Sequence, residues 1–233
     1  MSEIRADKIH NVTGDNDSGI DLSTNDQIIL KTADTTALTI SSSQVATFAN
    51  LPSGDNGDVL LSTITASSDD EIDFTGLFSS TYANYKIIAH NVHVSSDNTH
   101  IGLRYFIGGS IKSDSQYRGT RIRLHSGSSA AAADMVIGAV EQSDTEFAMF
   151  GGESTGNATG ENVNFHIIIY NPLATDNFKF IQSHQVGVDL SGDAQQIHYG
   201  GYYKNGQAAL TGVRIFTNTG NFASGTFRFF GMK

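Results

Sequence analysis

Alternating hydrophobic and polar residues are clearest in the C-terminal part of the chain. Residues 210–216 and 226–230 alternate with a period of two, which is the period of a β-strand with one buried face. Arg214 and Arg228 fall on the polar faces of these two predicted strands, and a loop rich in Asn, Thr, Gly and Ser joins them. We expect the second strand to close a sheet against strands formed earlier in the chain.

The same pattern recurs through the preceding residues at the spacing of strands in a β-sandwich. Three consecutive isoleucines, Ile167 to Ile169, predict a strand that is apolar on both faces, because it is central or because one face meets another subunit. Only residues 75–85 and 130–135 suit a helical turn, and the crossover helices of a parallel fold are not predicted. The sequence therefore predicts an all-β chain whose residues 58–233 form an antiparallel, jelly-roll-like β-sandwich. The strands expected before the final two are 59–65, 85–94, 101–107, 120–124, 135–140, 146–150, 163–170, 178–184 and 196–203.

The N-terminal part has too few hydrophobic positions for a core of its own. Short apolar runs separated by hydroxyl-rich turns recur through residues 19–50 as a weak repeat. We expect copies of the chain to pool these runs in an intertwined, short-stranded stalk; a disordered linker is the alternative. Residues 1–18 are interpreted as an anchor that orders on a partner, or as a frayed terminus, and residues 51–57 as a Pro- and Gly-containing linker. The residues expected at the contact between copies are Ile20, Leu22, Ile28, Leu30, Leu38, Ile40 and Phe48.

Composition supports this fold class and argues against several functions. Hydrophobic residues make up 39% of the 233 residues, and the 24 Gly fit a protein with many turns. A net charge of −10 with scattered basic residues argues against nucleic-acid binding. The chain has no Cys, and neither a signal peptide nor a membrane-spanning run is predicted. We expect a protein that folds in a cytoplasm and does not insert into a membrane.

The sequence predicts no catalytic residue, no cofactor and no metal site, and therefore a protein that is not an enzyme. Neither a phosphate-binding glycine loop nor a nucleophile elbow is expected between a strand and a helix. The acidic residues of 15–21 do not have EF-hand spacing, and those of 68–71 fit a solvated loop. His90 and His93, three residues apart on a predicted strand, should face opposite sides and not share an ion. A site built from His on different strands stays open, although surface or cross-strand His is favoured.

Side chains suited to ligand binding are concentrated in residues 195–204. A tyrosine offers a flat apolar face and a polar edge, which bind sugar rings and protein surfaces. We consider a platform of tyrosines with hydrogen-bonding neighbours, and a second cluster in residues 113–118. The alternative, which we favour, is that these tyrosines pack across strands or between subunits. The candidate binding residues are Gln196, His198, Tyr199, Tyr202, Tyr203 and Lys204 in the first segment, and Tyr117 and Arg118 in the second.

Four stretches, 21–32, 72–87, 170–179 and 210–228, resemble parts of a family of bacteriophage virion proteins, mostly tail-fibre or appendage proteins of marine phages. The first resembles the family's repeat-like stalk, and the others resemble the opening, the central turn and the closing hairpin of its head domain. The resemblance implies a homotrimeric tail fibre, assembled in the host cytoplasm and located in the virion. It would contact other virion proteins through its N-terminus and adhere to a host-surface glycan or envelope protein. A capsid decoration or head fibre is the alternative, and a glycan-cleaving tailspike enzyme is less favoured.

Overall fold

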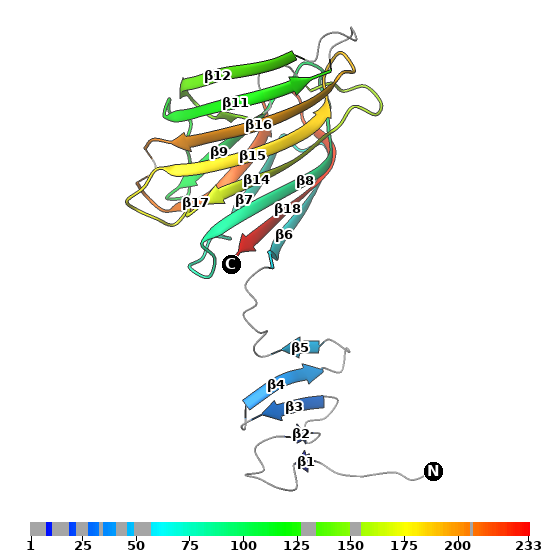
Figure 1. Cartoon of the computed structure of the whole chain (residues 1–233), viewed down its shortest axis with the longest axis vertical. Helices are drawn as coiled ribbons and strands as arrows, with labels where there is room; N and C mark the ends of the chain where they lie inside the picture. The colour runs from blue at the N-terminus through cyan, green and yellow to red at the C-terminus, as the bar shows by residue number, and fades with distance from the viewer. Residues whose placement is uncertain are drawn as a thin grey trace. The chain divides into compact units, whose positions relative to one another are not determined.

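The computed structural model divides the chain into two compact units, Met1–Asp55 and Asn56–Lys233 (Figure 1). All regular secondary structure among the described residues is β-strand, which confirms the all-β prediction. The part of the chain that is described contains no helix long and apolar enough to cross a membrane. The described residues are strands 8–10, 19–21, 28–32, 35–40 and 46–48, followed by 57–126, 134–149, 155–205 and 207–233.

The N-terminal unit contains five short antiparallel strands, each paired with its neighbour in sequence. The predicted short strands are therefore confirmed, and the winding of several copies around one another stays a prediction. The strands are β1 (Lys8–His10), β2 (Gly19–Asp21), β3 (Ile28–Thr32), β4 (Thr35–Ile40) and β5 (Ala46–Phe48).

The register of these strands aligns most of the positions expected at the contact between copies. Positions 20, 30, 38 and 48 are paired in succession across β2 to β5, and position 28 is paired with 40. Ile20, Leu30 and Leu38 are only half-buried by their own chain, and Ile28 is 43% exposed. An apolar row of this kind gains further burial when another surface covers it. Leu22 lies outside the described residues.

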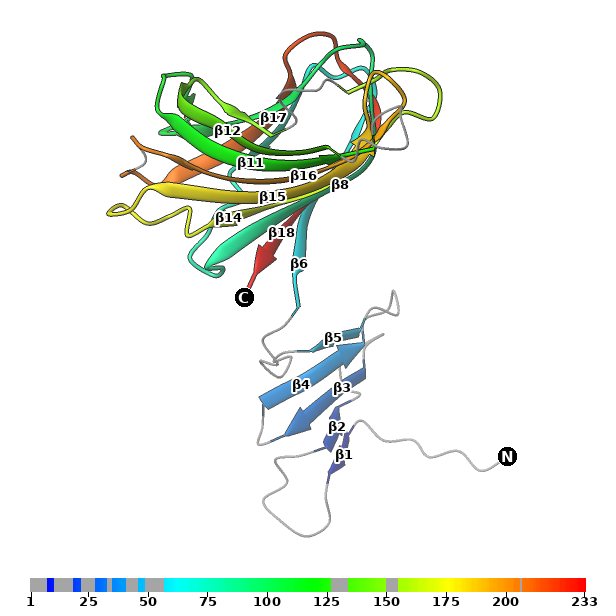
Figure 2. The ribbon, with the colours of Figure 1, turned by 45° about the horizontal axis from the view of Figure 1, so that its top comes forward.

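The C-terminal unit is a sandwich of two antiparallel sheets (Figures 1 and 2). The larger sheet has the order β12-β11-β16-β15-β14-β8-β18-β6, and the smaller has the order β10-β9-β17-β7, with β13 paired to β9. Figure 1 shows β9, β17 and β7 behind the larger sheet. The strands are β6 (Val59–Ala66), β7 (Glu71–Thr75), β8 (Asn84–Val94), β9 (Ile101–Ile107), β10 (Ser110–Ile111), β11 (Tyr117–His125), β12 (Asp134–Asp144), β13 (Phe147–Ala148), β14 (Val163–Tyr170), β15 (Lys179–Val188), β16 (Ala194–Tyr203), β17 (Leu210–Thr217) and β18 (Phe222–Met232).

The core between the sheets is rich in aromatic side chains. Phe229 of β18 stacks on Phe74 of β7 with ring centroids 5.0 Å apart, which joins the two sheets at this end. A second cluster surrounds Tyr117, whose ring lies 4.7 Å from that of Tyr203 and 4.8 Å from that of Phe147. These side chains are all buried. Because aromatic pairs add to the stability that area burial supplies, both clusters should resist opening of the sandwich.

Tyr117 and Tyr203 also satisfy their hydroxyl groups within the core. The Tyr117 hydroxyl donates to the carbonyl oxygen of Lys112 at 2.9 Å and accepts from the backbone N–H of Tyr105 at 3.0 Å. The Tyr203 hydroxyl donates to Oδ1 of Asp114 at 2.7 Å. The pKa of both hydroxyls is raised, mainly because burial disfavours the charged form. These two tyrosines are structural members of the core.

The two C-terminal strands do not form the closing hairpin that the resemblance implied. β17 lies in the smaller sheet, where it pairs with β7 and β9, whereas β18 lies in the larger sheet between β8 and β6. The connection therefore passes from one sheet to the other. Arg214 of β17 binds Asp73 of β7 through two hydrogen bonds of 2.8 and 2.6 Å and also pairs with Glu71, which explains its place beside an acidic strand.

Candidate binding face

An aromatic row lies across the outer face of the larger sheet. Arg118, Tyr202, Phe180 and Tyr170 occupy paired positions on β11, β16, β15 and β14, so their side chains stand side by side. Phe180 is 47% exposed and Tyr170 is 36% exposed. The row borders a hollow of about 960 Å³ on this face. Contiguous exposed apolar patches of this kind often mark interaction sites, whereas single exposed apolar side chains are common.

Two consecutive glycines of β16 determine the floor of this hollow. A Cβ at Gly200 would have no heavy atom within 4 Å, so this outward position leaves open space beside Tyr202. Gly201 faces inward, where a Cβ would lie 2.6 Å from the carbonyl oxygen of Arg118 and 3.0 Å from the Phe147 ring. The first glycine therefore opens the floor, and the second allows the two strands and the core beneath them to approach closely.

Neighbouring contacts hold the aromatic row in place. Phe178 stacks on Tyr202 with ring centroids 5.3 Å apart and planes at 14°, and Phe180 lies 5.6 Å from the same ring. The Tyr170 hydroxyl donates to Oε1 of Gln182 at 2.9 Å. A ring packed between other rings loses little conformational freedom when it binds a ligand, because it is already ordered.

Arg118 is the charged residue at the end of the row. Its Nη1 donates to the carbonyl oxygens of Ser115 and Tyr117, at 3.3 and 3.0 Å, which orients the guanidinium group. Among the described residues that line the hollow it is the one charged side chain, and none of them is Asp or Glu. The hollow thus combines aromatic faces with one fixed cation and the polar side chains of Gln182 and Thr120.

A row of three histidines crosses the same face farther along the sheet. His166, His184 and His198 are paired in register on β14, β15 and β16. The His184 and His198 rings stack at 4.3 Å, and Nε2 of Gln196 lies 2.8 Å from Nε2 of His184. Burial lowers the pKa of His166 and of His184, and His198 lowers both further. These two imidazoles are therefore neutral at pH 7, as their close packing requires.

The platform of Tyr199, Tyr202 and Tyr203 is wrong in two of its three members. Tyr199 and Tyr203 are buried between the sheets, as is Tyr117 of the second cluster, and this is the packing across strands that the favoured alternative predicted. Tyr202 alone of the four stands on the outer face, because alternation along β16 places it opposite in direction to Tyr203.

The remaining predicted binding residues lie outside the core. Arg118 and Tyr202 are brought together by the β11–β16 register, whereas Gln196 and His198 belong to the histidine row, and exposed Lys204 follows the end of β16. Sequence reasoning missed Phe178, Phe180 and Tyr170. The sequence did contain a signal for Phe180: in the predicted strand 178–184 it is next to Ile181, and neighbouring strand residues face opposite sides, so Phe180 faces outward when Ile181 is buried.

His90 and His93 face the same side, contrary to the prediction. Asn91 has a φ of 52°, and the pairing of β8 with β14 shifts register next to it, which marks a β-bulge. Because the bulge adds one residue between them, His90 and His93 face the same side of the sheet. Both stand on the outer face, beside buried Ala89 and Val92. They do not meet a third ligand: the group of metal-ligating side chains found among the described residues lies elsewhere.

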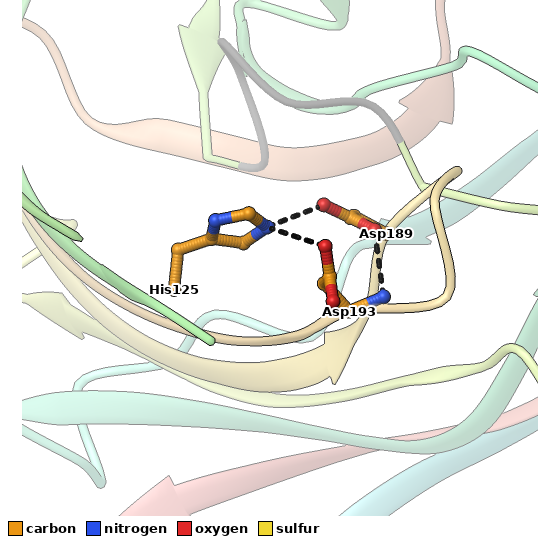
Figure 3. A group of neighbouring side chains, drawn as sticks. All are labelled: His125, Asp189 and Asp193. Carbon is orange, nitrogen blue, oxygen red and sulfur yellow. Dashed lines mark hydrogen bonds and ion pairs between the residues drawn. The ribbon is translucent and has the colours of Figure 1, made fainter. Parts of the chain in front are cut away.

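That group consists of His125, Asp189 and Asp193 (Figure 3). His125 is the last residue of β11, and the two carboxylates come from the turn between β15 and β16. Nε2 of His125 lies 2.7 Å from Oδ2 of Asp189 and 3.7 Å from Oδ2 of Asp193. The sequence analysis missed it, because the histidine and the carboxylates are far apart along the chain and share no motif spacing.

One short motif has the spacing of a catalytic signature. Residues 152–156 read Gly-Glu-Ser-Thr-Gly, which has the GxSxG spacing of a nucleophile elbow. Thr155 is a bridge residue, and the residues after it form turns that lead to β14 rather than a helix. Ser154 lies outside the described residues. The strand–turn–helix setting that an elbow requires is therefore not formed by the described residues around this motif.

Comparison with protein-family models, with curated proteins and with solved structures finds no match to this chain.

Proposed function

We propose that this chain is a non-enzymatic adhesion module whose sandwich binds a surface glycan through the aromatic row of its outer face. The observation that carries the proposal is the outer-face row Tyr170, Phe180 and Tyr202, aligned across three strands beside an open hollow. An outer sheet face is more often polar, and three aromatic side chains gathered beside a hollow are typical of an interaction site.

The chemistry of the hollow favours a carbohydrate. Aromatic rings provide flat apolar faces for the C–H faces of sugar rings, and polar edge groups bind the hydroxyls. Gly200 leaves room for a ring over the floor, while Thr120 and Gln182 provide hydrogen-bonding groups. The oriented guanidinium group of Arg118 adds a preference for a glycan that carries carboxylate or phosphate.

The biological setting that we propose is the virion of a tailed bacteriophage. The support is the resemblance of four stretches to phage appendage proteins, together with the half-buried apolar row of the N-terminal strands. In this proposal three copies join through that row, the N-terminus docks on other virion proteins, and the sandwich is displayed as a tail-fibre head. Several copies on one particle convert weak glycan contacts into firm attachment.

Two alternatives in the same setting differ in place and in chemistry. A capsid decoration would use the same oligomer on the shell, and particle imaging with an antibody to residues 57–233 distinguishes shell from tail. A glycan-cleaving enzyme needs two carboxyl groups about 5–10 Å apart around the scissile bond. The described lining of the hollow contains no Asp or Glu, which favours binding over hydrolysis there.

The test is glycan binding by the purified full chain and a matched pair of variants. A microarray of bacterial surface polysaccharides identifies the ligand, and Tyr202→Ala should weaken binding to it at least tenfold, about 1.4 kcal/mol. Leu124→Ala is the control, because Leu124 is 44% exposed on the same face of β11 but lies outside the hollow. Equal loss in both variants, or no glycan bound by the unmodified chain, would contradict the proposal.

A further inference from the structure

The end of the sandwich next to the β15–β16 turn brings together an imidazole and two carboxylates that neither the sheet nor the outer face requires. The ligand atoms of His125, Asp189 and Asp193 all lie within 4.8 Å of one another (Figure 3). Two ligands of a tetrahedral Zn²⁺ site, each about 2.0–2.1 Å from the ion, are about 3.3 Å apart. The observed separations from Nε2 of His125, 2.7 and 3.7 Å, are close to that value on either side.

Asp189 is held in the orientation that a ligand needs. Its side chain is buried, and Oδ1 accepts hydrogen bonds from the backbone N–H groups of Ser191 at 2.8 Å and Asp193 at 3.0 Å. Oδ2 is thereby directed at His125. The backbone of the turn therefore holds one oxygen of this buried carboxylate, and the other oxygen faces His125.

Two buried polar side chains beside this group lack partners. Gln195 is paired with His125 across β16 and β11, so the two side chains stand on the same inner face. Gln195 is 2% exposed, and neither its Oε1 nor its Nε2 has a hydrogen-bond partner among the described residues. Thr155 is paired with Asp189 through an isolated bridge, is fully buried, and its Oγ1 also lacks a partner there.

We propose that His125, Asp189 and Asp193 bind a divalent transition-metal ion of the Zn²⁺ class, with Gln195 and Thr155 completing its surroundings. An ion pair between His125 and Asp189 accounts for their 2.7 Å contact, but it leaves the buried amide and hydroxyl unsatisfied, which is rare in folded proteins. A bound ion, directly or through its water, gives Oε1 and Oγ1 a partner.

The ligand chemistry selects the class of ion. One imidazole nitrogen with two carboxylates suits Zn²⁺, whereas Ca²⁺ and Mg²⁺ prefer oxygen ligands alone. The site ties the end of β11 to the β15–β16 turn and to the segment at Thr155. The side chains of His125 and Asp193 are 17% and 19% exposed, which leaves a route for the ion to enter. The expected role is to stabilise this end of the sandwich.

The experiment uses the full chain, freed of metal with a chelator and then titrated with Zn²⁺ alone. We expect one strong site per chain by calorimetry and a higher melting temperature with the ion present. His125→Ala should weaken binding at least tenfold and abolish the thermal shift. His184→Ala is the control, because its imidazole belongs to the histidine row of the outer face, the other place where Zn²⁺ would bind. If His184→Ala removes the strong site and His125→Ala keeps it, the proposal is wrong.

A spectroscopic measurement on the unmodified chain keeps the test independent of whether the variants fold. Co²⁺ replaces Zn²⁺ in such sites, and its visible absorption reports the geometry and the number of ligands. We expect the intense bands of a four- or five-coordinate ion with nitrogen and oxygen ligands, lost on addition of one equivalent of Zn²⁺. No binding at 100 µM Co²⁺ or Zn²⁺, or a purely octahedral spectrum, would overturn the assignment.

Discussion

Truncation of Phe229 should destabilise the sandwich far more than truncation of its neighbour Phe230. The Phe229 side chain is fully buried, and its ring lies 5.0 Å from Phe74, 5.5 Å from Tyr85 and 5.7 Å from Phe78. Replacing a buried Phe by Ala costs about 3–5 kcal/mol, because transfer energy is lost and a cavity remains. For a domain of this size that corresponds to a fall in melting temperature of about 6–20 °C.

Phe230 is the matched control because it is the next residue on β18 and faces the other way. Its truncation should cost about 1 kcal/mol or less, in the range of surface substitutions. Thermal and urea unfolding of the full chain, followed by circular dichroism at one protein concentration, measures both variants. If the two free energies of unfolding differ by less than 1 kcal/mol, β18 does not have the assigned register, and the placement of the closing strand between β8 and β6 is wrong.

Two further predictions concern pH and backbone packing. The pKa values of His166 and His184 are lowered below 6.5 in the folded chain, so the unfolded chain binds more protons at acid pH. The stability that these two histidines contribute is complete above about pH 6.5 and is lost as the pH falls below it. Thermal unfolding between pH 7.5 and 5 should show this loss. Replacing both histidines by Gln should flatten the dependence of the melting temperature on pH. Gly201→Ala should cost about 1–3 kcal/mol in urea unfolding, because its Cβ would lie 2.6 Å from the Arg118 carbonyl oxygen, whereas Gly200→Ala should change stability by less than about 0.5 kcal/mol. Equal effects of the two alanines would refute the assigned facing of β16.

The strands could be predicted because burial on one face leaves a period-two pattern in the sequence. Residues 101–107 and 163–170 were bounded correctly, and Ile167 to Ile169 lie on a strand inside the larger sheet, as the run of apolar residues indicated. β7 was missed because Glu71 and Asp73 made its polar face resemble an acidic loop. Those carboxylates pair with Arg214, a partner that local sequence does not reveal.

The pairing of strands could not be predicted, because it depends on contacts between distant residues. A loop rich in turn residues joins β17 and β18, and such a loop suits a hairpin and a crossing between sheets equally. The bulge at Asn91 was hidden for the same reason: one residue with a positive φ reverses the parity of all that follow it on the strand. Both site assignments that failed, the tyrosine platform and the facing of His90 and His93, depended on parity or pairing.

One strand, β16, contributes to both the outer face and the core, but through different side chains. Mutation can therefore separate the proposed function from stability. Tyr203 and Tyr199 point into the sandwich and Tyr202 points out of it, so one strand supplies both the core and the aromatic row. A change at Tyr203 removes a buried ring and its hydrogen bond to Asp114, and any loss of glycan binding would then follow from unfolding. A change at Tyr202 leaves that packing in place. A binding face on a rigid sheet therefore predicts that a change at Tyr202 weakens binding without loss of stability, whereas a change at Tyr203 lowers stability and weakens binding only as far as the chain unfolds.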